Sequence, residues 1–335
     1  MVPLYTAFAI VALADAVTFL SVLFGILLVA LLGEFALYRA RRYRLTRTVF
    51  RGVRFDQHGS AWNYAWRAVA WWAAVALTLG LAYPWAQASL QRFKMRHTSY
   101  GDLPGGFAGT GSALFVRGFP IWLVVVLPLV IGFIAASGLV DWDSLSKAIG
   151  QGDDDAIDRL IDNSPQLGLA FGIALTAVVT SMIAFVALFP LFKAVLLRWW
   201  ISGLRFGSVA VTSKLPTGAV YRVYLRFALY LALFVSLAAG FGVALLHAVD
   251  LFLARASNAN QSELAASAMT LCFYVVIALG ASTIYQIVVT AAMWRLGAQS
   301  AELAGAQALD NVRATGGESS ALGEGLADAL GVGGV

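Results

Sequence analysis

Residues 16–33 read AVTFLSVLFGILLVALLG, an apolar run without a single charged side chain. A helix rises about 1.5 Å per residue, so about 20 apolar residues are needed to cross a hydrocarbon core of roughly 30 Å. Similar uncharged runs occur at residues 68–90, 119–140, 167–192, 227–246 and 264–294. Because buried helices of soluble proteins are normally amphipathic, the pattern predicts an all-α polytopic membrane protein with about six transmembrane or membrane-embedded helical segments.

These runs divide the chain into three predicted parts. Residues 1–38 form an N-terminal transmembrane segment, since no basic segment precedes the apolar run as it would in a signal peptide. Residues 39–310 form a repeat-containing membrane domain with an acidic outer loop at 141–166. Its spans are expected near residues 62–90, 119–140, 167–192, 227–246 and 264–294. Residues 311–335 are rich in Gly and Ala, which is typical of a flexible tail.

Loop charge predicts the orientation, because Lys and Arg are enriched in short cytoplasmic loops. Residues 39–54 carry seven Arg and no acid, so the basic loops and the C-terminus are expected in the cytoplasm. The rule conflicts with itself at 62–90, which has basic segments on both sides. Either this stretch is re-entrant or interfacial, broken near Thr78 and Pro84, or one basic loop defies the rule. Five Trp between residues 62 and 85 favour the first alternative, since Trp concentrates at membrane interfaces.

An internal repeat accompanies the basic segments. At an offset of 106 residues, Arg92-Phe93 matches Arg198-Trp199, and at an offset of 50 residues, residues 42–45 match residues 92–95. Each unit would comprise the inner end of a span, a basic aromatic turn and a polar segment with strand character. The polar segments are residues 51–57, 98–110 and 205–214. They would form short cytoplasmic β-hairpin-like loops that pair into a small sheet, unless they are three unrelated loops.

Three stretches carry a family resemblance: residues 55–62 (FDQHGSAW), 77–85 (LTLGLAYPW) and 92–98 (RFKMRHT). With the ending at 323–328, they make the chain from about Tyr38 onward similar to the YjgN-like family of bacterial inner-membrane proteins, a domain of unknown function. The resemblance implies a multi-pass protein of the bacterial inner membrane. It also suggests a membrane-associated metallopeptidase as a partner. The most specific motif comprises Thr78, Leu79, Gly80, Tyr83, Pro84 and Trp85.

Two groups of polar residues are candidate sites. Ionisable residues in or beside spans are functional candidates, although each would also fit at the membrane interface; these are Asp15, Glu34, His247 and Asp250. Basic residues of the aromatic turns attract anionic lipid headgroups or another anionic ligand, unless they only fix the topology. These are Arg42, Arg44, Arg92, Lys94, Arg96, Arg198 and Arg205. Their dispersal among juxtamembrane turns argues against nucleic acid.

No pattern of residues indicates an enzyme. The sequence lacks the motifs of metalloproteases, phosphate-binding loops and serine hydrolases. With Cys272 as the single cysteine and three His in all, neither a metal site nor a cofactor is expected. Small residues such as Gly168 and Gly172 favour close helix contacts, within the chain or in a homo-oligomer.

Two hypotheses about function follow. The leading one is a transporter-like or channel-like conduit for a small polar or lipidic ligand, because repeats and broken spans are typical of transporters. The alternative is a non-catalytic membrane scaffold or accessory subunit that holds a membrane protease or another partner. A conduit requires a polar cavity lined by several spans, whereas a scaffold requires a sealed bundle with a large surface outside the membrane.

Overall fold

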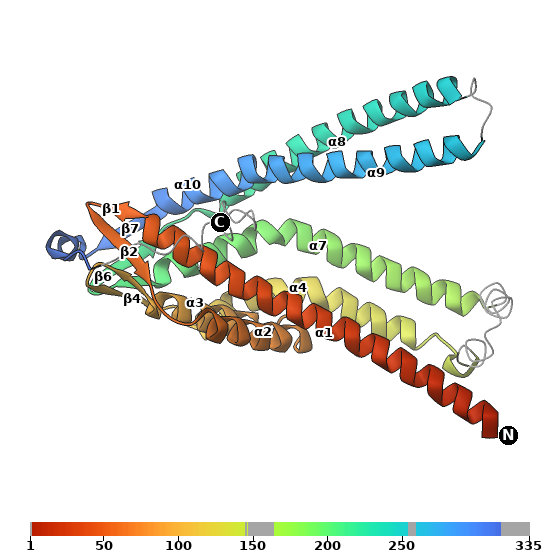
Figure 1. The fold of residues 1–335 in the computed structure, drawn as a ribbon, viewed down its shortest axis with the longest axis horizontal. Helices are drawn as coiled ribbons and strands as arrows, with labels where there is room; N and C mark the ends of the chain where they lie inside the picture. The colour runs from red at the N-terminus through yellow and green to blue at the C-terminus, as the bar shows by residue number, and fades with distance from the viewer. Residues whose placement is uncertain (1, 145, 147–163, 254–258, 316–335) are drawn as a thin grey trace. The chain divides into compact units, whose positions relative to one another are not determined.

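The computed structural model describes residues 2–144, 146, 164–253 and 259–315 (Figure 1). Most of the acidic loop at 141–166 and of the tail at 311–335 therefore lies outside the described residues. The chain divides into two units, one made of residues 1–112 and 197–335 and the other of residues 113–196. Each unit is described by itself.

Within the described residues, five helical segments are long and apolar enough to cross a membrane: Val17–Arg47, Gly111–Ser137, Pro165–Gly203, Thr217–Leu245 and Thr270–Ser300. The first belongs to α1 (Val2–Arg47), and the next three belong to α4 (Gly111–Ser137), α7 (Pro165–Gly203) and α8 (Thr217–Leu253). The fifth runs through α9 (Ala259–Ile284), the π-helical turn η1 (Tyr285–Thr290) and α10 (Ala291–Ser300). These five helical segments have the length and apolarity that the sequence analysis expected of membrane spans.

The stretch at 62–90 is not a sixth span of this kind. It forms a helical hairpin, with α2 (Ala61–Leu77) and α3 (Tyr83–Arg96) separated by a turn in which Leu79 and Gly80 have φ of 49° and 93°. The turn ends where Pro84 occupies the first turn of α3, a position that tolerates its missing N–H. Gln57 precedes the hairpin and Thr98 follows it, and the two residues pair in the sheet. The chain therefore leaves the sheet and returns to it, so that both basic segments adjoin the sheet.

The prediction of an all-α fold is wrong, because a seven-stranded antiparallel sheet is present in the order β1 to β7. The strands are β1 (Val49–Phe50), β2 (Val53–Gln57), β3 (Thr98–Tyr100), β4 (Leu103–Phe107), β5 (Leu204–Phe206), β6 (Val209–Ser213) and β7 (Ala301–Ala304). Three tight hairpins follow α1, α3 and α7, and long-range pairs join them to one another. Segments 51–57, 98–110 and 205–214 each contribute strands to it.

The chain after β7 crosses the turns of the hairpins. The 3₁₀ helix η2 (Ala306–Asn311) brings Asp310 within 2.7 Å of Arg51 in the β1–β2 turn. Next to it, the backbone N–H of Arg313 donates to the carboxylate of Asp102 in the β3–β4 turn, at 3.0 Å. Gly101, with φ of 56°, has no room for a side chain because its Cβ would strike the carbonyl oxygen of Arg313. The C-terminal segment thus fastens the sheet.

Large apolar side chains cover the outside of the spanning helices. In α1, for example, Phe19, Phe24 and Val29 are 67%, 67% and 71% exposed. Such surface is stable against lipid chains and unstable in water. Helices α8 and α9 lie side by side (Figure 1), and Gly280 of α9 lets the ring of Phe234 approach its backbone.

Candidate functional site

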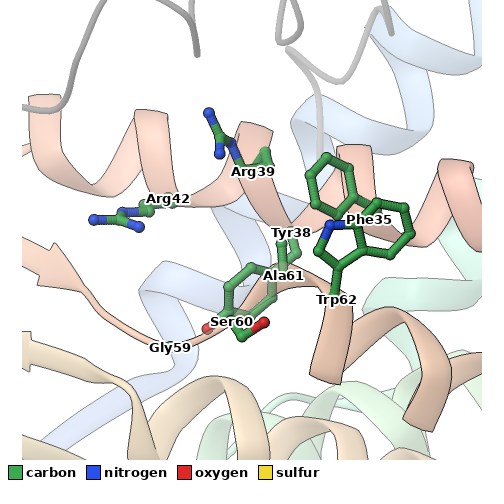
Figure 2. A pocket seen from close by; sticks show the side chains of 8 residues that line it. All are labelled: Phe35, Tyr38, Arg39, Arg42, Gly59, Ser60, Ala61 and Trp62. Carbon is green, nitrogen blue, oxygen red and sulfur yellow. The ribbon is translucent and has the colours of Figure 1, made fainter.

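A pocket of about 250 Å³ lies between α1 and the start of α2 (Figure 2). Residues of one face of α1 form one wall, and the segment that leads into α2 forms the other. The lining residues are Phe35, Tyr38, Arg39, Arg42, Gly59, Ser60, Ala61 and Trp62. The lining of the pocket therefore includes two Arg and three aromatic residues.

The wall formed by the α2 end is fixed by local contacts. Ser60 caps α2, and its Oγ accepts a hydrogen bond from the backbone N–H of Asn63 at 3.4 Å. Gly59 has φ of 93°, and a Cβ there would lie 2.7 Å from the ring of His97, so only glycine fits. The first backbone N–H groups of a helix have no partner within it and favour negative charge. Ala61 and Trp62, in this first turn, line the pocket.

Aromatic contacts hold the two walls together. Figure 2 shows Phe35 and Trp62 next to each other, and their ring centroids are 4.5 Å apart. Tyr38 reaches from α1 to the other wall, where its hydroxyl donates to the carbonyl oxygen of His58 at 2.7 Å. Its ring stacks on that of Tyr64 at 4.9 Å. Tyr38 thus lines the pocket on one side and contacts a buried cluster on the other.

The buried cluster joins α1, α2 and α3. Its apolar part contains Tyr38, Ala61, Tyr64, Ala68 and Leu90. Beside this cluster, the carboxylate of Glu34 accepts an exposed hydrogen bond from Nε1 of Trp72 at 2.9 Å. Burial, and next the charge of Glu34, raise the pKa of Tyr64 above its ordinary range. Glu34 therefore lies beside two residues of α2.

Two basic residues, Arg41 of α1 and Lys94 of α3, lie near Glu34 or near each other. Arg41 of α1 contacts Sδ of Met95 at 3.7 Å. Burial, and next the charge of Arg41, lower the pKa of Lys94 on α3 to about 8, while Glu34 acts in the opposite direction. Lys94 of α3 is therefore acted on by two charges of α1, those of Arg41 and Glu34.

Gln57 lies at the end of β2, close to the start of α2 in the chain. Its side chain is fully buried, and neither of its polar atoms reaches a hydrogen-bond partner in the described part of the chain. In the sheet, Gln57 pairs with Thr98, which follows α3 closely in the chain. Buried polar atoms without partners are uncommon in proteins.

The motif at 78–85 forms the turn of the helical hairpin. The hydroxyl of Thr78 donates to the carbonyl of Ala74 at 2.7 Å and accepts from the N–H of Ala82 at 3.0 Å. Burial raises the pKa of Tyr83. Trp85 packs over Gly111, whose Cβ would lie 2.7 Å from the indole ring. The motif therefore shapes α2 and α3, and its residues do not line the pocket.

The predicted basic residues fall in different places. Arg42 lines the pocket, Lys94 lies in the buried cluster, Arg44 lies in the last turn of α1, and Arg96 is exposed at the end of α3. Arg92 donates to the carbonyl of Gly109 at 3.2 Å, and Arg198 donates to the hydroxyl of Thr217 at 2.9 Å. Arg205 donates to the carbonyls of Ser202, Leu204 and Val211. These last three tie helices and strands together.

Of the four ionisable candidates, Glu34 lies beside the cluster. His247 is exposed on α8, whereas the side chains of Asp15 and Asp250 lie outside the described part of the structure. Sequence reasoning did not select Tyr38, Tyr64, Gln57, Arg39 or Arg41 as site residues. Arg39 and Arg41 stood in the recognised basic segment, but nothing in the sequence indicated which face of α1 each occupies.

In the part of the chain that the structure describes, five helices long and apolar enough to cross a bilayer indicate a membrane protein, and a sheet of strands accompanies them. More particularly, the chain belongs to DUF898, a family of bacterial proteins of unknown function whose family model matches residues 3–329. The match is consistent with the resemblance to the YjgN-like family. Neither a curated protein nor a solved structure matches the chain.

Proposed function

We propose that the protein is a bacterial inner-membrane protein that binds an anionic, lipid-like ligand in the pocket between α1 and α2. The observation that carries this proposal is the pairing of Arg39 and Arg42 with the aromatic rings of Phe35 and Trp62 in one pocket. Residues 17–30 of the same helix expose apolar side chains along several turns before the pocket. A ligand with an anionic head and an acyl chain matches both features.

The position of the pocket along α1 supports a ligand that comes from the bilayer. Arg39 and Arg42 follow directly on the apolar run of α1, where basic side chains meet lipid headgroups. Under the charge rule, this end of the helix and the sheet beside it face the cytoplasm. The ligand would then come from the inner leaflet, because basic residues at the cytoplasmic end of a span meet the headgroups of that leaflet.

The wider role that we propose is transporter-like: the pocket recognises the ligand, which then moves along the spans. The sequence repeat, with a helix followed by a hairpin three times in the chain, favours this role because transporters are commonly built from repeats. The broken helix at α2 and α3 favours it as well, since interrupted helices line the substrate sites of many transporters.

The second candidate is a scaffold for a membrane metallopeptidase, favoured by the sheet, which would offer a folded surface outside the bilayer.

The test compares binding of phosphatidylglycerol and phosphatidylcholine to the purified protein in nanodiscs, with native mass spectrometry as the readout. Each Arg near the surface contributes about 1 kcal/mol toward an anionic headgroup, or about fivefold in affinity. The double variant Arg39→Gln/Arg42→Gln is expected to lose roughly 30-fold of the preference for phosphatidylglycerol. The matched control is Arg222→Gln/Arg226→Gln, which removes the same charge from exposed positions on α8.

The pocket is supported if Arg222→Gln/Arg226→Gln keeps the preference for phosphatidylglycerol while Arg39→Gln/Arg42→Gln loses it. Equal losses in both double variants would mean that general surface charge, not the pocket, attracts the lipid. A wild-type protein without any preference would exclude the proposal. Transfer of a fluorescent anionic lipid between leaflets of proteoliposomes then separates the two roles, because a scaffold binds lipid without accelerating its transfer.

A further inference from the structure

The exposed face of helix α2 is apolar along its whole length. Trp62, Trp66 and Leu77 are 46%, 63% and 86% exposed, and their spacing places them on one face of the helix. Ala70 and Ala73, which are exposed as well, lie on the same face between them. A helix that faces water exposes polar and charged side chains there. The surface of α2 is therefore suited to an apolar medium.

Charged side chains are confined to the half of the hairpin that adjoins the sheet. Between Arg67 of α2 and Arg92 of α3, the sequence contains no Asp, Glu, Lys or Arg. Both arginines are exposed, and so is Leu79 in the turn between the helices, at 72%. An uncharged tip with basic residues behind it is the arrangement of a segment that enters lipid and keeps its charges at the headgroups.

The turn between α2 and α3 satisfies its own backbone donors. Each N–H from Thr78 to Tyr83 donates to an acceptor within the hairpin, at 2.8 to 3.2 Å. The N–H of Ala82 uses the hydroxyl of Thr78, and the others use carbonyl oxygens. The next residue, Pro84, has no N–H. A turn in water can leave such donors to the solvent, whereas a turn in hydrocarbon must pair them internally.

Along α2, the contacts with α1 move toward the apolar run of α1. Just before α2, the carbonyl of His58 accepts a hydrogen bond from Tyr38 of α1. Further along, Trp72 donates to Glu34, which directly follows the uncharged run 16–33. From Trp72, α2 continues beside α1 (Figure 1) for five more residues, or about 7.5 Å. The tip therefore lies beyond Glu34, on the side of the lipid-facing surface of α1.

We propose that the α2–α3 hairpin is a re-entrant element whose tip, residues 77–83, inserts into one leaflet of the bilayer from the side of the sheet. Leu77 and Leu79 contact acyl chains there. The 17 residues of α2 extend over about 25 Å, too short for a core of roughly 30 Å, and the chain returns to the sheet that it left. The partner of this surface is thus lipid hydrocarbon, continuous with the lipid around α1.

The experiment measures the depth of the tip by spin labelling of the full-length protein in phosphatidylcholine vesicles. A nitroxide is attached to Leu77→Cys or Leu79→Cys in a Cys272→Ala background, which removes the native thiol. Collisions of the nitroxide with oxygen, which concentrates in hydrocarbon, are compared with collisions with a polar nickel chelate. The matched controls are Phe24→Cys, on the exposed apolar surface of α1, and Lys214→Cys, at an exposed ion pair of the sheet.

At both tip positions, the ratio of oxygen to chelate collisions is expected to match that at Phe24→Cys. It should exceed the ratio at Lys214→Cys by roughly tenfold, because a polar chelate is excluded from hydrocarbon. A nitroxide at Trp66→Cys, nearer to the sheet, should give a ratio between these two. Should Leu77→Cys fail to fold, Leu79→Cys is compared with the same controls.

Three results would overturn the proposal. A ratio at the tip equal to that at Lys214→Cys would place the tip in water. Few collisions with either reagent would mean that protein, either a second copy or another partner, covers the tip. Equal ratios at Trp66→Cys and Leu77→Cys would mean that the hairpin lies flat on the membrane surface. Because the vesicles contain no anionic lipid, and Arg39→Gln/Arg42→Gln should leave the depth unchanged, this proposal and the proposed function fail separately.

Discussion

Replacing Lys94 by Met is expected to stabilise the protein at neutral pH. The ammonium of Lys94 lies in a buried cluster next to Arg41, and burial is the main reason why its pKa falls to about 8. Below pH 8, Lys94 is charged in both the folded and the unfolded chain, so the folded protein bears the whole cost of the buried charge. Met has a similar unbranched chain and no charge, and it removes that cost.

The size of the effect follows from the pKa. A pKa lowered from 10.5 to about 8 corresponds to about 3 kcal/mol of unfolding free energy. Between pH 8 and pH 10.5, the unfolded chain keeps a proton that the folded protein releases, so the stability of the wild-type protein rises with pH in this window. The Lys94→Met variant lacks this rise. Its advantage of about 3 kcal/mol at pH 7 should vanish near pH 10.5.

The assay is unfolding by sodium dodecyl sulfate in mixed micelles, followed by Trp fluorescence at several values of pH from 7 to 10.5. Lys214→Met serves as the control, since Lys214 is exposed and pairs with Glu302 at the surface. A Lys94→Met variant that is less stable than wild type at pH 7, or that shows the same pH slope, would refute this account of the cluster.

Three further predictions concern helix and sheet contacts, all measured by the same unfolding titration. Glu34→Gln should cost about 1–2 kcal/mol, because the hydrogen bond from Trp72 then ends on a neutral acceptor. Gly101→Ala should destabilise the protein by more than Gly52→Ala and should expose the C-terminal segment to protease; both positions have positive φ, but only the first would strike neighbouring atoms. Gly280→Leu should separate α8 from α9, at a cost of about 1–3 kcal/mol, because an aromatic ring of α8 occupies the space.

The helical hairpin at 62–90 was predicted from the sequence only in part. Basic segments on both sides of 62–90 and the density of Trp indicated that this stretch is not an ordinary span. The motif around Thr78 and Pro84 marked the break. The run was nevertheless counted as one of six segments, because hydropathy averages over a window and does not register a turn made by Leu79 and Gly80 in the middle of it.

The candidate site was predicted only in part. Glu34 was selected because an acid beside an apolar run is unusual, and Lys94 and Arg42 were selected as members of basic turns. Gln57 stood inside a quoted motif without a role, and Tyr38 and Tyr64 resembled the many other aromatic residues of the chain. Their importance comes from the contacts between α1 and α2, which bring residues 26 positions apart into one cluster.

The amino-acid sequence by itself indicated a membrane protein and located five helices long and apolar enough to cross a bilayer, because the length and apolarity of a run are local properties of the chain. It also marked the segments that become strands. The tertiary structure alone decided that these strands form one sheet, since their partners are distant in the chain, as with β4 and β5. Likewise, only the approach of α1, α2 and α3 placed Glu34, Arg41 and Lys94 near one another, and a charge acquires an altered pKa only once its neighbours are in place.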